Sequence, residues 1–158
     1  LKSPLRLIFL DFDFYYLKFS HNFIKTVLKV KLYKILSIIV SIVVLSAWTF
    51  KLNQPSVFRG GTSSNMSEEF AAYGLNDTIM IVVGIFKVFL AIVLLTGALK
   101  LPKLIKPAAL GIALFMAGAV YFHISIGDGI LPTLPAASML LCCLVLVLNP
   151  KGIGYPKG

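Results

Sequence analysis

Four long apolar runs dominate the pattern of hydrophobic and polar positions along the chain. Each has about 20 predominantly apolar residues, the length that lets an α-helix cross the hydrocarbon core of a bilayer. They cover residues 32–50, 78–99, 105–126 and 130–148. Pro102 and Pro107 bracket the short connection between the second and third runs, where a helical hairpin needs a break. The pattern predicts an all-α membrane protein, a bundle of four transmembrane helices.

The composition agrees with this fold class. Of the 158 residues, 58% are hydrophobic and 13% are charged, whereas a soluble domain carries about 25% charged residues. The formal net charge of +9 does not indicate nucleic-acid binding, because the lysines flank apolar segments and form no stripe with interleaved aromatic residues. We therefore expect the lipid bilayer, and no nucleic acid, as the main partner.

The basic residues predict the orientation of the bundle, because they collect on one side of the predicted membrane. These are Lys25, Lys29, Lys31, Lys34, Lys100, Lys103, Lys106, Lys151 and Lys157. The other side has two basic residues, Lys51 and Arg59, beside four acidic ones. Since basic loops stay in the cytoplasm, we expect both termini there.

The long connection between the first two spans contains a further predicted helix, "NMSEEFAAYGL". Asn65 is a suitable N-cap, Glu68 three residues later fits a capping box, and Gly74 is a suitable stop. We expect this helix to lie on the extracytoplasmic surface and to cover the mouth of the bundle.

Residues 31–150 are the predicted four-helix domain, and residues 151–158 a cytoplasmic tail. We expect residues 1–30 to be an extension, either disordered or the product of a mis-assigned start, with the functional protein beginning near Val30 or Lys31. The alternative is an interfacial helix, although this stretch lacks the strongly charged face of such helices.

Lys87 is the most informative single residue, because it lies about three turns inside the second span. A charge near the bilayer centre costs at least about 2.5–3.5 kcal/mol on insertion scales, so such a residue normally faces the bundle interior. The alternative is that its long stem carries the ammonium to the membrane surface.

His123, Asp128 and Tyr121 lie near the outer end of the third span, the end toward which Lys87 extends. Together with Lys87 they are our candidate ligand-binding residues. The alternatives are an interfacial histidine bonded to a backbone carbonyl, and a tight turn in which Asp128 caps the fourth span.

The sequence offers little support for a metal or a thiol centre. His21, the only other histidine, belongs to the opposite side of the predicted membrane, so we expect no metal site. Cys142 and Cys143 are adjacent inside the fourth span, where a bridge between neighbours would be strained. We expect them to be packing residues.

From Arg59 to Leu148 the chain resembles the DoxX-like family of small bacterial membrane proteins. The resemblance rests on "EEFAAYGL", "VVGIFKVFLAIVLLTG" and "AVYFHISIGDG". It implies a protein of the bacterial cytoplasmic (inner) membrane that is an accessory subunit of a quinone-linked redox or oxidative-stress system. The resemblance carries over no catalytic residues, so whether the chain is an enzyme stays open.

Three hypotheses follow. In the first, the bundle holds a quinone near Lys87 and His123 and works with a membrane or periplasmic redox partner. In the second, it is a non-catalytic scaffold that holds a partner through its outer loop. In the third, it is a small-solute carrier, which four spans would support only as a homo-oligomer.

Overall fold

A computed structural model describes the backbone of residues 4–148. The side chains of residues 4–23, Thr26 and Lys29 lie outside the described set, as do residues 1–3 and the predicted tail at 151–158. The chain forms two compact units, Leu1–Tyr33 and Lys34–Gly158. All the candidate site residues belong to the second unit.

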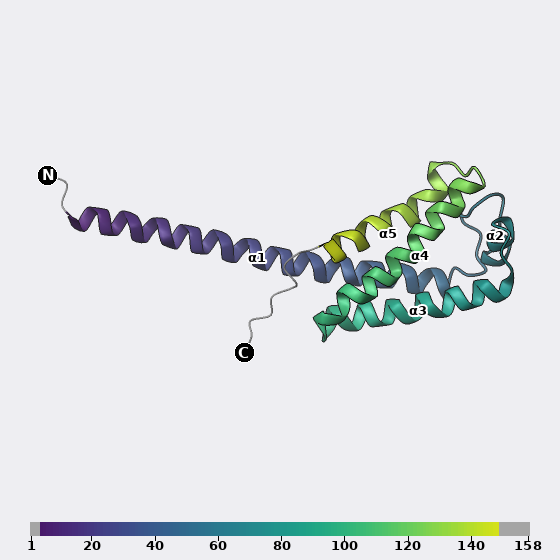
Figure 1. The fold of residues 1–158 in the computed structure, drawn as a ribbon, viewed down its shortest axis with the longest axis horizontal. Coiled ribbons are helices and arrows are strands. Elements are labelled where there is room, and N and C mark those ends of the chain that lie inside the picture. Colours follow the sequence, from purple (N-terminus) through teal and green to yellow (C-terminus); the bar gives the residue numbers. More distant parts are fainter. Residues whose placement is uncertain (1–3, 149–158) are drawn as a thin grey trace. The chain divides into compact units, whose positions relative to one another are not determined.

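The described residues form helices and no strand. The elements are α1 (Pro4–Trp48), α2 (Met66–Ala72), α3 (Asp77–Leu99), the 3₁₀ turn η1 (Pro102–Leu104), α4 (Ile105–Ser125) and α5 (Ile130–Leu148). Within the second unit, α4 packs against both α3 and α5, and the short α2 packs against α3 (Figure 1).

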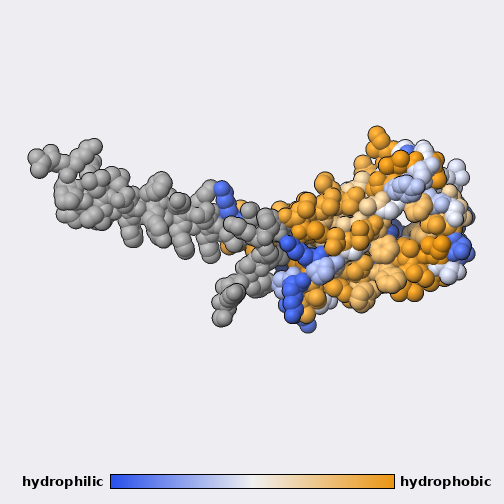
Figure 2. Space-filling view, viewed as in Figure 1, coloured by the Kyte–Doolittle hydropathy of each residue, from blue (hydrophilic) through white to orange (hydrophobic). Residues whose placement is uncertain are grey.

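Four helical segments are long and apolar enough to cross a membrane, at Val30–Trp48, Asp77–Leu99, Pro102–Ser125 and Ile130–Leu148. Figure 2 shows hydrophobic residues over much of the visible surface of the bundle, with hydrophilic residues at its two ends. Such a surface is stable only against lipid. The predicted fold class is confirmed: this is a multi-pass α-helical membrane protein with a short helix between its first two spans.

The extension predicted at residues 1–30 is helical where its backbone is described, since α1 begins at Pro4. The assignment of these residues to a segment outside the four-helix domain stays a prediction.

Small residues let the helices approach one another, as lipid-embedded bundles require. Ala109 and Ala113 of α4 are buried, and so are Ser37 and Ser41 of α1. The Ser41 hydroxyl donates to the Ser37 carbonyl at 2.8 Å, which satisfies its donor inside the bundle. Ala117, four residues after Ala113, is exposed, so this row of small buried residues ends at Ala113.

The predicted caps of α2 are present. The Asn65 side chain accepts from the backbone N–H of Glu68 at 2.9 Å, and the Glu68 carboxylate accepts from the N–H of Ser64 at 2.6 Å. Gly74 has φ +75°, and the N–H groups of Gly74 and Leu75 bond back to the last turn at 2.9 Å each. This Schellman pattern ends the helix.

The helix α4 ends in the same way, and here the motif shapes the site. Gly127 has φ +75°, its N–H donates to the Ile124 carbonyl at 3.1 Å, and the N–H of Asp128 donates to the His123 carbonyl at 2.9 Å. A Schellman motif places these two outer residues side by side. The backbone turn therefore brings Asp128 to His123.

The substitution Gly127→Ala should lower the free energy of unfolding by about 1–2 kcal/mol, because only the left-handed backbone conformation opposes it. A Cβ at this position would meet no atom within 4 Å. Reversible unfolding in detergent measures the difference. Gly129→Ala is the matched control, since its Cβ would also be in open space and Gly129 is not among the glycines with positive φ. Equal losses in the two variants would contradict the explanation.

Candidate functional site

His123 and Asp128 form the closest polar pair of the site. His123 Nδ1 lies 2.6 Å from Asp128 Oδ2, and the two side chains are only 6% and 7% exposed. An ionised carboxylate only accepts hydrogen bonds, so Nδ1 carries the proton of this contact. The other ring nitrogen, Nε2, lies 3.4 Å from the Tyr73 hydroxyl oxygen.

Asp128 also holds the loop that precedes α2. Its second oxygen, Oδ1, accepts from the backbone N–H of Gly61 at 2.8 Å. The Asp128 carboxylate thus orients the His123 ring and also connects the end of α4 to Gly61, which lies far away in the sequence. This use of Asp128 differs from the capping of the fourth span that the sequence left open.

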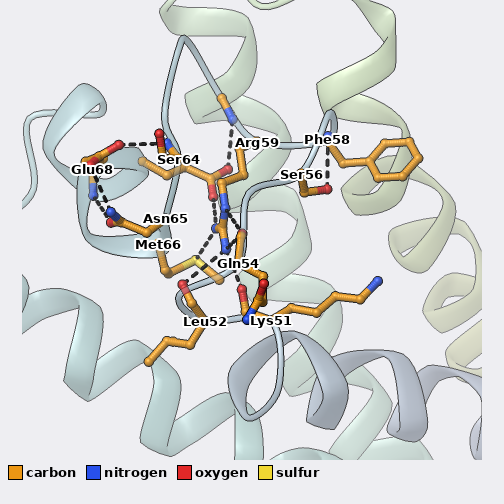
Figure 3. Close-up of polar contacts among 12 residues, drawn as sticks. Lys51, Leu52, Gln54, Ser56, Phe58, Arg59, Ser64, Asn65, Met66 and Glu68 are labelled. Carbon is orange, nitrogen blue, oxygen red and sulfur yellow. Dashed lines mark hydrogen bonds and ion pairs between the residues drawn. The ribbon is translucent and has the colours of Figure 1, made fainter.

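Arg59 and Glu69 form a buried ion pair on the other side of the same loop. The guanidinium Nη1 lies 3.0 Å from Glu69 Oε2. Arg59 also donates to backbone carbonyls of the 51–54 turn, as Figure 3 shows, including those of Leu52 at 3.1 Å and Gln54 at 2.9 Å. Its Nη1 lies in addition 3.7 Å from Met66 Sδ. The arginine therefore holds the loop together by hydrogen bonds to several of its residues. All of its N–H groups are used in these contacts, so none is left to bind a ligand.

Tyr73 connects the two pairs. Its hydroxyl donates to Glu69 Oε1 at 3.0 Å, and its oxygen lies 3.2 Å from His123 Nδ1. Its ring stacks on Phe122 with centroids 5.3 Å apart. Burial, and then the negative charge of Glu69, raise the pKa of the Tyr73 hydroxyl above its ordinary value. The hydroxyl therefore stays protonated, and a continuous polar chain runs from Arg59 to Asp128.

Lys87 differs from these residues because none of the described residues is its polar partner. It lies near the middle of the 23-residue α3, about 15 Å from the start of the helix at about 1.5 Å per residue. The residue is only 9% exposed. Within the described part of the chain, its ammonium makes no hydrogen bond and no ion pair. Nζ lies instead 5.3 Å from the ring centroid of Trp48 and 6.0 Å from that of Phe115.

The direction of the Lys87 side chain follows from helix geometry. Each Cα–Cβ bond of an α-helix tilts toward the N-terminus, and the N-terminus of α3 lies at the end of the bundle where α2 packs. The lysine stem therefore points from mid-membrane depth toward the polar chain. Contacts with aromatic faces stabilise such a cation by about 0.5–2 kcal/mol.

These side chains line a partly open cavity of about 290 Å³, whose wall also includes the exposed residues Phe58 and Leu114. Its polar lining residues are Glu69, Tyr73, Lys87 and His123, and its aromatic ones include Trp48, Phe70, Phe115 and Phe122. The rest of the wall is aliphatic or sulfur-containing. The arrangement offers one buried cation and one imidazole to a ligand that is otherwise apolar.

The structure brings together three of the four predicted site residues. Lys87 and His123 line the cavity, and Asp128 lies behind His123. Tyr121 does not join them: it is 66% exposed and does not line the cavity. Its neighbour Phe122 takes the inward position. The role of any of these residues in ligand binding stays a prediction.

The sequence analysis missed Arg59, Glu69, Tyr73 and Trp48. One signal was available: Glu69 and Tyr73 are four residues apart, so they share a face of a short helix, and Phe70 lies next to that face. An acidic residue beside aromatic ones on a helix next to the membrane indicates a buried polar contact.

Within the described residues, no three His, Cys, Asp or Glu side chains converge to hold a metal ion. Cys142 and Cys143 are free thiols, and Cys143 is buried in the packing of α5.

The four spans, the capped α2 and the buried polar chain define a small helical membrane protein with a partly open cavity. The model of the DoxX-like family matches residues 35–147, a range that contains every residue of this site. The chain therefore belongs to the DoxX-like family, as its resemblance indicated. No curated protein and no solved structure matches it significantly.

The buried ion pair gives a test of how the site is held together. Glu69→Gln should lower the free energy of unfolding by about 3–5 kcal/mol, because it leaves the Arg59 charge buried without a counter-charge. Unfolding in detergent measures the loss. Glu68→Gln is the adjacent control: Glu68 is exposed, and its replacement should cost no more than about 1 kcal/mol. Similar costs at both positions would show that the buried pair is unimportant.

Proposed function

We propose that this DoxX-like membrane protein binds a quinone in its partly open cavity, as an accessory subunit of a membrane redox system. The observation that carries the proposal is Lys87, a residue only 9% exposed that lines an aromatic cavity and whose ammonium has no polar partner in the described part of the chain.

The chemistry of Lys87 selects the ligand. A lysine ammonium only donates hydrogen bonds, and a charge at this depth is costly until it is paired. A quinone supplies carbonyl oxygens, which only accept, on a flat apolar ring that suits the faces of Trp48 and Phe115. The volume of about 290 Å³ is near the lower end of ligand sites, about 300–1,000 Å³, and suits one ring.

His123 adds a second polar contact of a different kind. Because Asp128 fixes the proton on Nδ1, Nε2 can accept a hydrogen bond from a ligand hydroxyl, such as that of a reduced quinone ring. Lys87 suits the carbonyl form of the ring, and His123 suits the hydroxyl form. A site with both contacts accommodates either oxidation state, as an accessory quinone-binding subunit requires.

The lysine distribution supports an orientation for this function. Lys100, Lys103 and Lys106 lie in and next to the connection of α3 and α4, at the end of the bundle away from α2. By the positive-inside rule, that end faces the cytoplasm. The cavity then lies toward the extracytoplasmic half of a bacterial inner membrane, where a redox partner would reach α2 and its loop.

The single tryptophan of the chain gives a direct test, because Trp48 lines the cavity. A water-soluble benzoquinone should quench its fluorescence saturably. Lys87→Met should weaken that binding about 10- to 100-fold, the equivalent of one charge-assisted hydrogen bond of about 1.5–3 kcal/mol. Tyr121→Phe, an exposed position outside the cavity, should leave the affinity unchanged.

Unchanged affinity in both Lys87→Met and His123→Ala would refute the quinone site. Extraction of protein purified from its native membrane provides an independent check, since bound quinone is identified by mass spectrometry. Protein that contains no quinone but retains a partner through the loop before α3 would favour the scaffold hypothesis.

A further inference from the structure

Lys87 has a chemical property that its proposed hydrogen bond does not use. Among the described residues that line the cavity, it alone carries a primary amine. The residue is 9% exposed, and Nζ lies 5.3 Å from the ring centroid of Trp48 and 6.0 Å from that of Phe115. Lysine amines held in apolar pockets are the ones that proteins use as nucleophiles toward carbonyl carbons. The cavity therefore offers a carbonyl compound a nucleophile as well as a hydrogen-bond donor.

The charges around the cavity favour a reaction that removes the charge of Lys87. The Glu69 carboxylate lines the same cavity. Its oxygens already accept from Arg59, from the N–H of Gly60 and from Tyr73. Among the described residues, no carboxylate forms an ion pair with the ammonium. An unpaired charge at this depth is costly, and a neutral imine carries none. A carbonyl ligand that only accepts a hydrogen bond leaves the charge in place, whereas an aldehyde that forms an imine removes it.

The opening of the cavity determines which aldehydes enter. Leu114, one of its lining residues, is 69% exposed and lies near the middle of α4. At about 1.5 Å per residue, this part of the rim is about 16 Å from the outer end of the helix, at the depth of the hydrocarbon core. An apolar aldehyde dissolved in the bilayer has access to the cavity there. The surrounding lipid keeps away the water that would hydrolyse an imine.

We infer that Lys87 is a covalent binding site for small apolar aldehydes, which it holds as a Schiff base. Nζ attacks the carbonyl carbon and forms a C–N bond, and the C–O bond then breaks as the aldehyde oxygen leaves in water. Two hydrogens of the ammonium leave in that water molecule and the third leaves as a proton, so nothing is oxidised or reduced. The inference goes beyond the proposed function, since it requires the buried amine and no quinone.

Other residues of the cavity suit the bound aldehyde. The His123 imidazole lines the cavity and is a base for the released proton. The rings of Trp48 and Phe115 lie beside Nζ and pack against the hydrocarbon part of the aldehyde. Trp48 is itself held against Gly84, where a Cβ would come within 2.5 Å of the indole. The volume of about 290 Å³ is near the lower end of ligand sites, so we expect the aldehyde to have no more than about one ring.

The test uses benzaldehyde, a single-ring apolar aldehyde, on the protein in lipid nanodiscs. Sodium borohydride reduces each imine to a stable secondary amine, and peptide mass spectrometry then gives the modified fraction of every lysine. Lys51 and Lys103 are internal references, because both are exposed and their imines are open to hydrolysis. At a benzaldehyde concentration that leaves the references mostly unmodified, we expect the modified fraction of Lys87 to be at least about tenfold higher than theirs.

A matched pair of variants on α4 tests whether the cavity causes this preference. Ala119 lines the cavity, whereas Ala117 is exposed and does not line it. Ala119→Phe should fill part of the cavity and lower the modified fraction of Lys87 at least about tenfold, with no change at Lys51. Ala117→Phe should leave both fractions as they are in the parent protein.

Equal modification of Lys87 and the two exposed lysines overturns the inference, and so does an Ala119→Phe variant that is modified like the parent protein. If Ala119→Phe does not fold, the comparison of lysines within the parent protein decides the matter. The proposed function has a separate readout. Saturable quenching of Trp48 by the benzoquinone, with no preferential modification of Lys87, supports the quinone site and refutes the aldehyde site. Preferential modification of Lys87 without such quenching supports the aldehyde site and refutes the quinone site.

Discussion

A positive charge held at mid-membrane depth is the constraint on which the rest of this structure depends. Placing Lys87 near the middle of α3 costs at least about 2.5–3.5 kcal/mol on insertion scales. The fold reduces this cost in two ways: the ammonium lies over the rings of Trp48 and Phe115, and the stem points toward the polar end of the bundle. Neither contact supplies a hydrogen-bond acceptor to the ammonium.

The carboxylates of Glu69 and Asp128 already bind other groups, which explains why Lys87 has no polar partner among the described residues. The Glu69 carboxylate accepts from Arg59, from the N–H of Gly60 and from Tyr73, while Asp128 accepts from His123 and the N–H of Gly61. Each carboxylate thus holds the loop before α2 to a helix. The two carboxylates therefore hold the polar wall of the cavity in place. They leave the Lys87 ammonium without a hydrogen-bond acceptor among the described residues.

The spans could be predicted from the sequence because apolar length alone decides which segments enter lipid, and the caps of α2 because Asn65 and Gly74 act locally. Which of Tyr121 and Phe122 faces inward could not be predicted from the sequence. Adjacent helical residues differ by about 100° around the axis, and only the packing of α4 on its neighbours selects the inner one. Glu69 and Tyr73 were missed for a related reason. Their face of α2 turns inward because Arg59, ten residues earlier, holds Glu69 there.

The buried face of α1 shows how one wall of the cavity is built. Ser37, Val40, Ser41 and Val44 are buried at helical spacing. Trp48 continues the same spacing at the last residue of the helix, where its ring meets the bare backbone of Gly84. A Cβ at residue 84 would come within 2.5 Å of the ring, so only a glycine there leaves room for the indole. The indole in turn lines the cavity beside Lys87, and the small residue on α3 and the large one on α1 therefore depend on each other.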